Sequence, residues 1–312
     1  MRLIDLLIAR GLSRGDARRA LQSGKVSLDG VPTADSGREV EDDPRVRYDP
    51  NAPRLTPGRD LVVLRKLPGL VVAWKPTGML SVPAPREGGH KNALAMIRRW
   101  FGAGLPVHRL DEDTSGLFMV ALDEPTQLGM KELLERHEVH RGYLALVAQH
   151  FPRGAWSVES EFVRDRGDGL RGSRVIPAAP GKPPKPRRFQ PEPDQETRRA
   201  VTHFSLVENL ARDAALISSR LETGRTHQVR IHLAEIGHPV LGDPLYATRR
   251  IAARAPRLAL HASRLAFTHP LTGEAVEVVA PLADDLEALR RSLSAREEED
   301  QPPTRRARAG GR

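Results

Sequence analysis

The 312-residue chain contains no cysteine. This excludes disulfides, iron–sulfur clusters, thiolate zinc sites and a cysteine nucleophile. No apolar run approaches the roughly 18 residues that a membrane-spanning helix requires. The first ten residues also lack the continuous apolar core and the cleavage site of a signal peptide. We therefore expect a soluble, cytoplasmic protein with no membrane partner.

Positive charge is in excess, and almost all of it is arginine. The chain has 42 arginines and 7 lysines against 40 acidic residues, with a formal net charge of +9. A basic balance of this size favours a polyanionic partner such as RNA, DNA or an acidic membrane surface. Biased codon usage is an alternative explanation of the arginine excess.

Residues 1–50 have the pattern of a small unit with two helices and a hairpin. Apolar residues recur at helical spacing on both sides of Ser13. Ser13 with Asp16 three positions later is a start signal similar to a capping box. Asp29-Gly30 between alternating apolar residues predicts a tight hairpin turn.

Three arginines of this unit, Arg10, Arg14 and Arg18, lie four residues apart. They share one helical face or continue across the junction of the two helices. A solvated charged face is the alternative explanation. The run SRGDARRALQSGKVSLDG resembles the alpha-L RNA-binding domain of a small-subunit ribosomal protein. That resemblance implies that the basic face binds structured RNA.

The remaining chain divides into a linker, a large domain and a tail. Residues 51–61 are rich in Pro and Gly and predict a linker. Residues 165–199 are Pro-rich and polar and predict a flexible insertion, and residues 296–312 predict a disordered tail. Residues 62–295 alternate strand and helix patterns, with strands at 70–74, 143–147, 201–207, 215–221 and 276–279, helices at 92–100, 124–137 and 228–236, and a last helix capped by Asp284.

The most informative stretch is the run HRLDEDTSGL at residues 108–117, a polar loop that leads into an apolar strand. Such loops commonly carry catalytic groups. Its residues alone fit a nucleophilic carboxylate, a hard-metal site or a capped surface turn. A metal site needs more oxygen ligands from elsewhere, and no metal motif is recognisable. A glycosidase-like pair of Asp111 and Asp113 is disfavoured, because residues two apart on an extended segment point to opposite faces.

A second stretch, LETGRTHQVRIHL, covers residues 221–233. Gly224 permits a tight turn, and Thr226 is a candidate cap for the helix that follows. The fork of Arg225 is long enough to reach a carboxylate or a phosphate. Cleft or interface histidines are the plain interpretation of His227 and His232.

Both stretches resemble the two main motifs of the RluA-type RNA pseudouridine synthases. The Lys75-Pro76-Thr77-Gly78 turn is similar to an early turn of that family, residues 140–147 to its tyrosine strand and residues 258–281 to its C-terminal strands. These matches run in order over residues 62–290. The alpha-L domain is a common companion of this family.

The resemblance implies an α+β fold, with a mixed, largely antiparallel sheet around a central cleft. It implies that Asp111 is the catalytic aspartate, that Arg225 forms an ion pair with it, and that Tyr143 lies under the target base and acts in proton transfer. It assigns RNA or substrate binding to His108, Arg109, Thr114, Lys75 and His227, with His108 and Thr114 supporting the loop and Lys75 lining the cleft. Arg141 departs from the family, which usually has Lys there.

The implied reaction isomerises uridine to pseudouridine, breaking N1–C1′ and joining C5 to C1′. No atoms are gained or lost, so we expect no cofactor and no metal. The carboxylate has three routes: attack on the sugar, attack on the base or removal of a sugar proton. The expected partner is RNA, with ribosomal RNA favoured over transfer RNA, and the expected state is a monomer. The alternatives are a catalytically silent RNA-binding or ribosome-assembly factor and a carboxylate-dependent glycosidase. Retention of Asp111, Arg225 and Tyr143 favours the active isomerase.

Overall fold

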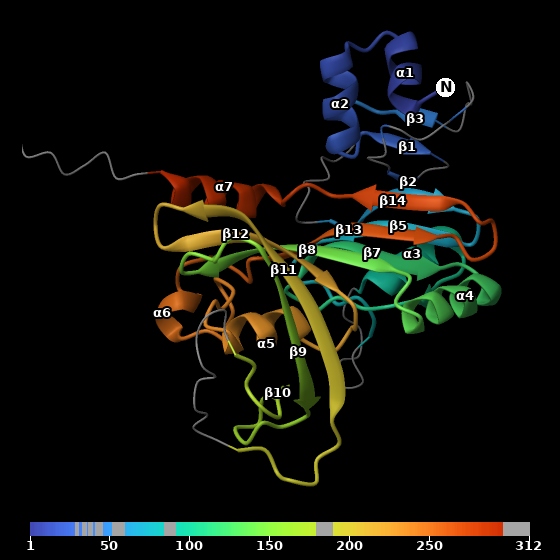
Figure 1. Ribbon diagram of the computed structural model, residues 1–312. Helices are drawn as coiled ribbons and strands as arrows, with labels where there is room; N and C mark the ends of the chain where they lie inside the picture. The colour runs from blue at the N-terminus through green and yellow to red at the C-terminus, as the bar shows by residue number, and fades with distance from the viewer. Residues whose placement is uncertain are drawn as a thin grey trace, which may run out of the picture.

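The protein is described by a computed structural model with two sheets and helices around them (Figure 1). This arrangement confirms the predicted α+β class. The structure describes residues 1–28, 31–32, 36, 40, 46–51, 60–83, 92–178 and 190–295.

The N-terminal unit has the predicted order of two helices and a hairpin. Its helices are α1 (Leu3–Ala9) and α2 (Arg14–Gln22), and their apolar faces share a small core. Ser13 caps α2, because its Oγ accepts a hydrogen bond from the backbone N–H of Asp16 at 3.1 Å. The capping prediction is therefore confirmed.

A three-stranded sheet completes this unit. Strand β1 (Val26–Leu28) pairs antiparallel with β2 (Val31–Pro32) and with β3 (Val46–Tyr48). The register of Leu28 against Val31 leaves two residues for the turn. The strand pairing confirms the hairpin, while the Asp29-Gly30 turn itself lies outside the described residues.

The large sheet has eleven strands within the described residues. Its main path runs β10-β9-β11-β12-β8-β13-β7-β5-β4, with β14 beside β13 and β6 beside β7. All its pairings are antiparallel except that of β13 with β7. The strands are β4 (Val62–Leu67), β5 (Leu70–Lys75), β6 (Leu105–Pro106), β7 (Ser115–Ala121), β8 (His140–Ala148), β9 (Ala155–Val163), β10 (Gly172–Ser173), β11 (Arg198–Leu210), β12 (Ala214–Leu221), β13 (Leu260–Thr268) and β14 (Ala275–Val279).

The middle of this sheet is buried on both faces, so its strands are continuous apolar runs rather than alternating ones. Every residue of β5 and β7 is buried. Alternate residues belong to different cores: Val71 and Phe118 to one, Val72 and Met119 to the other. The first core includes residues of α3 (Ala93–Phe101), α5 (Gln228–Glu235) and α7 (Asp284–Ser294), and the second includes α4 (Glu124–Glu135).

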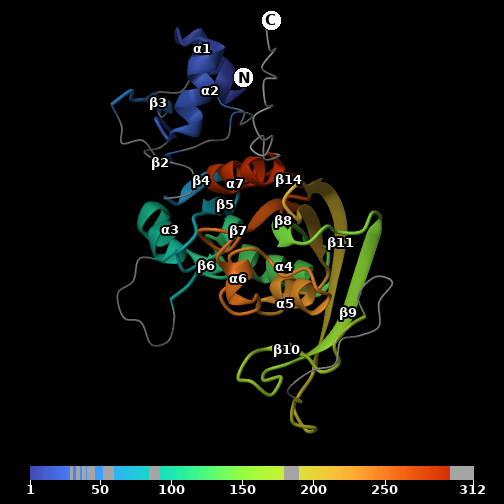
Figure 2. The same ribbon diagram turned by 90° about the vertical axis from the view of Figure 1, so that its left-hand side faces the viewer.

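Strands β9 and β11 extend beyond the body of the sheet as a long arm, with β10 near its tip (Figure 2). The N-terminal unit lies at the opposite end of the molecule in both views. A short helix, α6 (Arg249–Ala252), follows α5. Among the described residues, no helix combines the length and the apolar character needed to cross a membrane.

The segment 165–199 differs from the flexible insertion that its composition predicts. Residues 165–178 and 190–199 are described, and they include β10 and the start of β11. Asp165 and Gln195 exchange two hydrogen bonds, at 3.0 and 2.7 Å, and Arg174 donates to the carbonyl of Pro193 at 2.9 Å. Polar contacts hold the described residues 165–178 and 190–199 together. Residues 179–189, the linker residues 52–59 and the tail lie outside the described part of the chain.

Two predicted helix caps are wrong by one position. The cap of α7 is Ala283, and Asp284 is already the first helical residue. The cap of α5 is His227 rather than Thr226, and no side chain accepts a capping hydrogen bond there. At α5 the loop before the helix is held by the side chain of Gln228 instead of a cap. Its Oε1 accepts a hydrogen bond from the backbone N–H of Arg225 at 2.9 Å.

Candidate active site

Asp111 lies in the loop between β6 and β7, and the Lys75-Pro76-Thr77-Gly78 turn holds this loop from below. The ammonium of Lys75 donates to the carbonyls of Pro76, Met79 and Glu112 at 2.8, 2.6 and 2.8 Å. The backbone N–H of Gly78 donates to the same Glu112 carbonyl at 3.0 Å. The turn therefore fixes the backbone immediately after Asp111.

Hydroxyl groups fix the loop on both sides of Asp111. Ser81 Oγ donates to the carbonyl of Leu110 at 2.9 Å and accepts from its N–H at 3.0 Å. Thr77 Oγ1 donates to the carbonyl of Asp113 at 3.0 Å. Together with the contacts to Glu112, these hydroxyls hold the loop backbone at Leu110, Glu112 and Asp113, on both sides of Asp111, which limits the positions that the Asp111 carboxylate can take.

The expected position of Lys75 in the cleft is wrong. Its side chain is fully buried, and it does not line the pocket at Asp111. Burial lowers its pKa to about 7, an effect that the charge of Asp111 opposes. The three hydrogens of the ammonium match the three carbonyl acceptors, so Lys75 stabilises the backbone of the loop from the interior.

His108 and Thr114 make contacts at the two ends of the Asp111 loop. Nε2 of His108 accepts from the backbone N–H of Met119 at 3.1 Å, and burial lowers the His108 pKa to about 3. A neutral, partly buried imidazole that accepts a backbone hydrogen bond is a support for the loop rather than a contact for phosphate. The N–H of Thr114 donates to the carbonyl of Asp111 at 3.1 Å, and its buried hydroxyl has no hydrogen-bond partner among the described residues.

Gly116 explains how the loop enters the sheet beside Tyr143. Its φ is +115°, and a Cβ there would lie 2.2 Å from the carbonyl oxygen of Ala262. Only glycine permits this approach of β7 to β13. Ala262 is also the register partner of Tyr143 on β8, so the approach brings the Asp111 loop next to the tyrosine strand.

The guanidinium of Arg230 faces Asp111. Its Nη1 lies 3.4 Å from Oδ2 of Asp111, and its Nε and Nη2 bind Asp243 at 2.7 and 2.8 Å. The Asp243 side chain is fully buried, and that of Arg230 is 4% exposed. Asp243 thus fixes the plane of the guanidinium and leaves Nη1 for Asp111, whose side chain is 20% exposed.

The expected ion pair of Arg225 with Asp111 is therefore wrong: the arginine that pairs with Asp111 is Arg230. Arg225 is exposed, and its Nε donates to the carbonyl of Arg199 at 3.0 Å. The sequence does contain a signal for Arg230. It stands between Val229 and Ile231 in a helix buried on all sides, where a charged residue needs a buried partner.

His227 lies at the edge of this group in a strained conformation. Its φ is +59°, in the left-handed region that costs a non-glycine residue about 1–3 kcal/mol. Its Nε2 is 3.9 Å from Oδ2 of Asp111, and its Nδ1 contacts the hydroxyl of Tyr246 at 2.9 Å. Burial lowers the pKa of His227, so the ring is mainly neutral at neutral pH. This left-handed backbone conformation places the ring of His227 beside Asp111.

Tyr143 and Arg141 project from β8 into the same pocket. Both side chains are more than nine-tenths buried, at 8% and 9% exposure. Burial raises the pKa of Tyr143 to about 12, so its phenol keeps its proton at neutral pH. Gly224 makes room for Arg141, because a Cβ at Gly224 would collide with Nη1 of Arg141.

These groups line one small pocket of about 60 Å³. Asp111, Tyr143, Arg230 and His227 lie on its walls, together with Arg109, which is exposed. A carboxylate, a protonated phenol and the guanidiniums of four arginines, Arg109, Arg141, Arg225 and Arg230, therefore line one space. This set can bind a polar planar ring, hold a negative charge beside it and exchange a proton with it.

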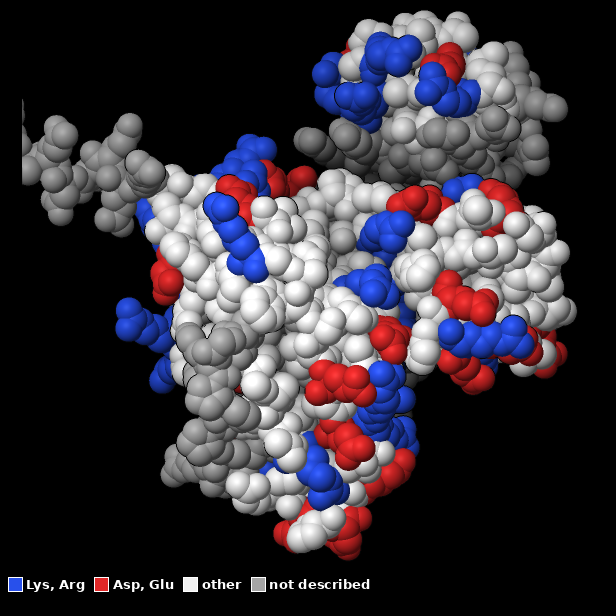
Figure 3. Space-filling model, viewed as in Figure 1, with Lys and Arg blue, Asp and Glu red and all other residues white. Residues whose placement is uncertain are grey.

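The basic residues of the N-terminal unit do not all have the same role. Arg10 ends α1, and its Nη1 donates to the carbonyl of Val46 at 2.7 Å, a contact within the fold. Arg14 and Arg18 lie on α2 and are exposed. Figure 3 shows Lys and Arg side chains gathered over the helices of this unit. The expected RNA contact thus has two exposed arginines on α2, of which Arg14 also lies 4.0 Å from the carboxylate of Asp5, and one arginine that supports the fold.

Comparisons with known proteins agree with this geometry. A family model described as "RNA pseudouridylate synthase" matches residues 69–235. The chain is 32% identical, over 94% of its length and 92% of the relative, to "Ribosomal large subunit pseudouridine synthase D" of Zymomonas mobilis. It is 33% identical, over 71% of its length and 93% of the relative, to "Dual-specificity RNA pseudouridine synthase RluA" of Escherichia coli K12.

A solved structure shares the fold. "Human RNA Pseudouridylate Synthase Domain Containing 4" superposes with a TM-score of 0.57 at 20% identity, over 74% of this chain and 92% of the human one. The family match covers β5 to α5, which includes both the Asp111 loop and the Arg230 helix. The chain therefore belongs to the RluA-type RNA pseudouridine synthases, a family of isomerases that act on RNA.

Proposed function

We propose that this protein converts specific uridines of a structured RNA to pseudouridine, with Asp111 as the catalytic carboxylate and ribosomal RNA as the favoured substrate. The observation that carries the proposal is the placement of the Asp111 carboxylate beside Tyr143, with Arg230 as its ion-pair partner. The relative from Zymomonas mobilis, named for the large ribosomal subunit, supports ribosomal RNA. The expected enzyme is a cytoplasmic monomer.

Each route open to the carboxylate starts from its anion. Arg230 stabilises that anion in a partly buried site, and Asp243 keeps Arg230 charged and oriented. The reaction then breaks N1–C1′, turns the uracil and forms C5–C1′, while the proton of C5 leaves and N1 gains one. The flat face of Tyr143 supports the uracil during this turn, and its protonated hydroxyl serves as a donor.

The uridine must leave its stack before it enters the pocket, which costs a few kcal/mol. Arg109 is exposed at the pocket and is suited to occupy the space that the flipped nucleotide leaves. The arginines of α2 extend the contact with RNA at a distance from the reaction. In this scheme the N-terminal unit supplies affinity and the pocket supplies chemistry.

The test is pseudouridine mapping of total RNA from cells with and without the gene. The proposal predicts that one or a few sites, chiefly in ribosomal RNA, disappear on deletion and return when the wild-type gene is restored. Loss of sites only from transfer RNA would contradict the substrate class. If no site changes and the purified protein also leaves that RNA unmodified, the chain is a silent RNA-binding factor and the proposal is wrong.

A further inference from the structure

A second and much larger cavity adjoins the pocket at Asp111. It encloses about 510 Å³, against about 60 Å³ for the pocket itself. The two share Gly224 and Arg225 as a common wall. A ligand that extends from one into the other would therefore contact this shared wall.

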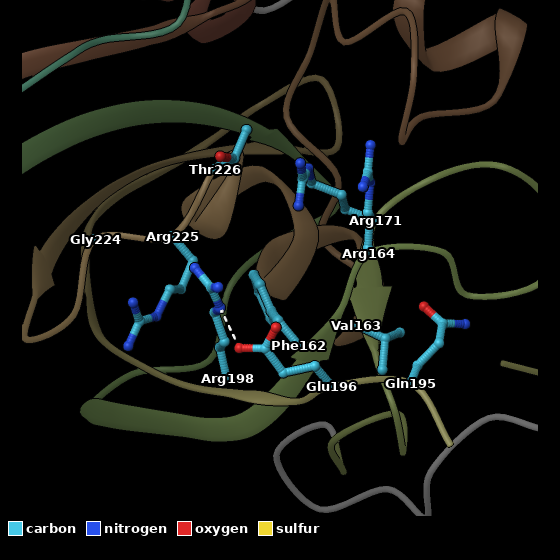
Figure 4. Close-up of a pocket in the computed structure, with 10 residues that line it drawn as sticks. All are labelled: Phe162, Val163, Arg164, Arg171, Gln195, Glu196, Arg198, Gly224, Arg225 and Thr226. Carbon is cyan, nitrogen blue, oxygen red and sulfur yellow. Dashed lines mark hydrogen bonds and ion pairs between the residues drawn. The ribbon is translucent and has the colours of Figure 1, made fainter. Parts of the chain in front are cut away.

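Arginine dominates the lining of this cavity. Arg164, Arg171, Arg198 and Arg225 contribute to it, with Glu196 as its only carboxylate. Glu196 pairs with Arg198 at 3.0 Å, while no carboxylate of the described residues lies within ion-pair distance of Arg164 or Arg171. Figure 4 shows Arg164 and Arg171 on one side of Phe162 and Arg198 and Arg225 on the other. The cavity is thus positively charged and ready for an anion.

These two arginines are carried by a loop that is held by hydrogen bonds. Arg164 follows β9 and Arg171 precedes β10, and between them Asp165 accepts from the N–H groups of Gly167 and Gly169, both at 2.8 Å. The loop is fastened to α5, because Glu235 binds the N–H and the hydroxyl of Ser173 at 2.9 and 2.5 Å. These bonds fix the backbone from which the exposed side chains of Arg164 and Arg171 extend.

The loop at residues 164–171 also contacts residues next to Asp111. The guanidinium of Arg166 lies 5.7 Å from the centre of the Tyr246 ring, and the hydroxyl of Tyr246 contacts His227. The charge of Arg171 also acts on His227. The cavity therefore belongs to the surroundings of the catalytic pocket rather than to a separate surface.

We infer that this cavity binds the nucleotide next to the target uridine, with its phosphate on Arg164 and Arg171. The inference rests on the proposed function, and it adds a second nucleotide subsite to that site. A volume of this size suits a whole nucleotide and exceeds the needs of a phosphate group alone. The polar edge formed by Glu196 and Arg198 would then meet the neighbouring base, which makes the identity of that base a determinant of site choice.

The test combines a protein change with an RNA change. The double variant Arg164→Gln/Arg171→Gln is compared with wild type and with Arg136→Gln/Arg153→Gln, which removes the same charge from exposed positions outside both pockets. The substrates are synthetic RNAs around a mapped target uridine. Each carries one methylphosphonate, which removes the charge of a single linkage. Apparent KM and the single-turnover rate at saturating protein are measured.

The inference predicts that one methylphosphonate beside the target raises the wild-type KM about tenfold and the double-variant KM less than about twofold. With unmodified RNA, the double variant should raise KM about tenfold while its saturated single-turnover rate stays near wild type. Equal methylphosphonate effects in all proteins, or a double variant that matches the control, would overturn the subsite. A wild-type protein that forms no pseudouridine in any RNA would instead overturn the proposed function, and the subsite with it.

Discussion

Asp243 holds Arg230 by two nitrogens at once, Nε at 2.7 Å and Nη2 at 2.8 Å. Both side chains are almost completely withdrawn from water. The third nitrogen, Nη1, is left for Asp111 at 3.4 Å. The buried carboxylate of Asp243 thus orients the guanidinium of Arg230, which pairs with the proposed catalytic carboxylate of Asp111. The ion-pair partner of Asp111 is therefore Arg230 and not Arg225.

This assignment predicts different losses for the two arginines. Replacement of Arg230 by Gln would leave the buried Asp243 carboxylate without its cationic partner and cost about 3–5 kcal/mol of stability. Arg230→Lys is the better probe, because it keeps the charge but not the fork. It should fold, as judged by its thermal transition, and lower the single-turnover rate at least about tenfold. Arg225→Gln should retain the saturated rate. A slower saturated rate for Arg225→Gln than for Arg230→Lys would contradict the assignment.

Buried histidine makes the fold sensitive to acid. His232 lies between Ser160 and Thr202 at 3.0 and 2.9 Å, and burial lowers its pKa from 6.5 to about 3. The unfolded chain therefore binds more protons between pH 6.5 and 3, and the free energy of unfolding must fall as the pH drops through this window. One such group contributes about 1.4 kcal/mol per pH unit.

His232→Asn should remove this contribution. Urea unfolding at pH 6.5, 5.5 and 4.5 should show a shallower loss of stability in the variant than in wild type, by about 2–3 kcal/mol over the two units. Carboxylates contribute a loss of the same sign in both proteins, so the difference between the two slopes isolates the histidine. Parallel slopes would show that His232 does not titrate in this way.

The basic face of α2 should act on affinity and not on chemistry. Arg14→Gln/Arg18→Gln removes two exposed charges and should reduce the slope of log affinity against log salt by about 1–2. The saturated single-turnover rate should not change. The control Arg136→Gln/Arg153→Gln should keep the wild-type slope. An unchanged slope in the α2 variant would remove the N-terminal unit from the RNA contact.

Local patterns predict the elements of this fold well where one physical effect dominates. The apolar runs at 70–74 and 143–147 are buried strands, and Ser13 caps α2 as its spacing with Asp16 indicates. The position of Asp111 in a polar loop before a buried strand is also local information. This local pattern predicts that Asp111 lies just before a buried strand, but it does not identify the residues that contact Asp111.

The residues that contact Asp111 depend on tertiary structure, and the sequence alone does not show which arginine pairs with it. Arg225 and Arg230 lie in one motif, and only the loop fixed by Gln228 turns the first outward and the second inward. The family resemblance placed Lys75 along the cleft, but three backbone carbonyls bind its ammonium in the interior. Residues 165–178 look flexible by composition, but hydrogen bonds to distant residues order them.

The most direct test of the account is the rate of pseudouridine formation by purified protein on RNA from cells that lack the gene. Wild type is compared with Asp111→Asn and with Asp113→Asn, a matched change two residues away at an exposed carboxylate. The account predicts that Asp111→Asn forms no detectable pseudouridine yet binds the RNA with an affinity near wild type, while Asp113→Asn remains active. Pseudouridine formation by Asp111→Asn at a rate close to wild type would contradict it.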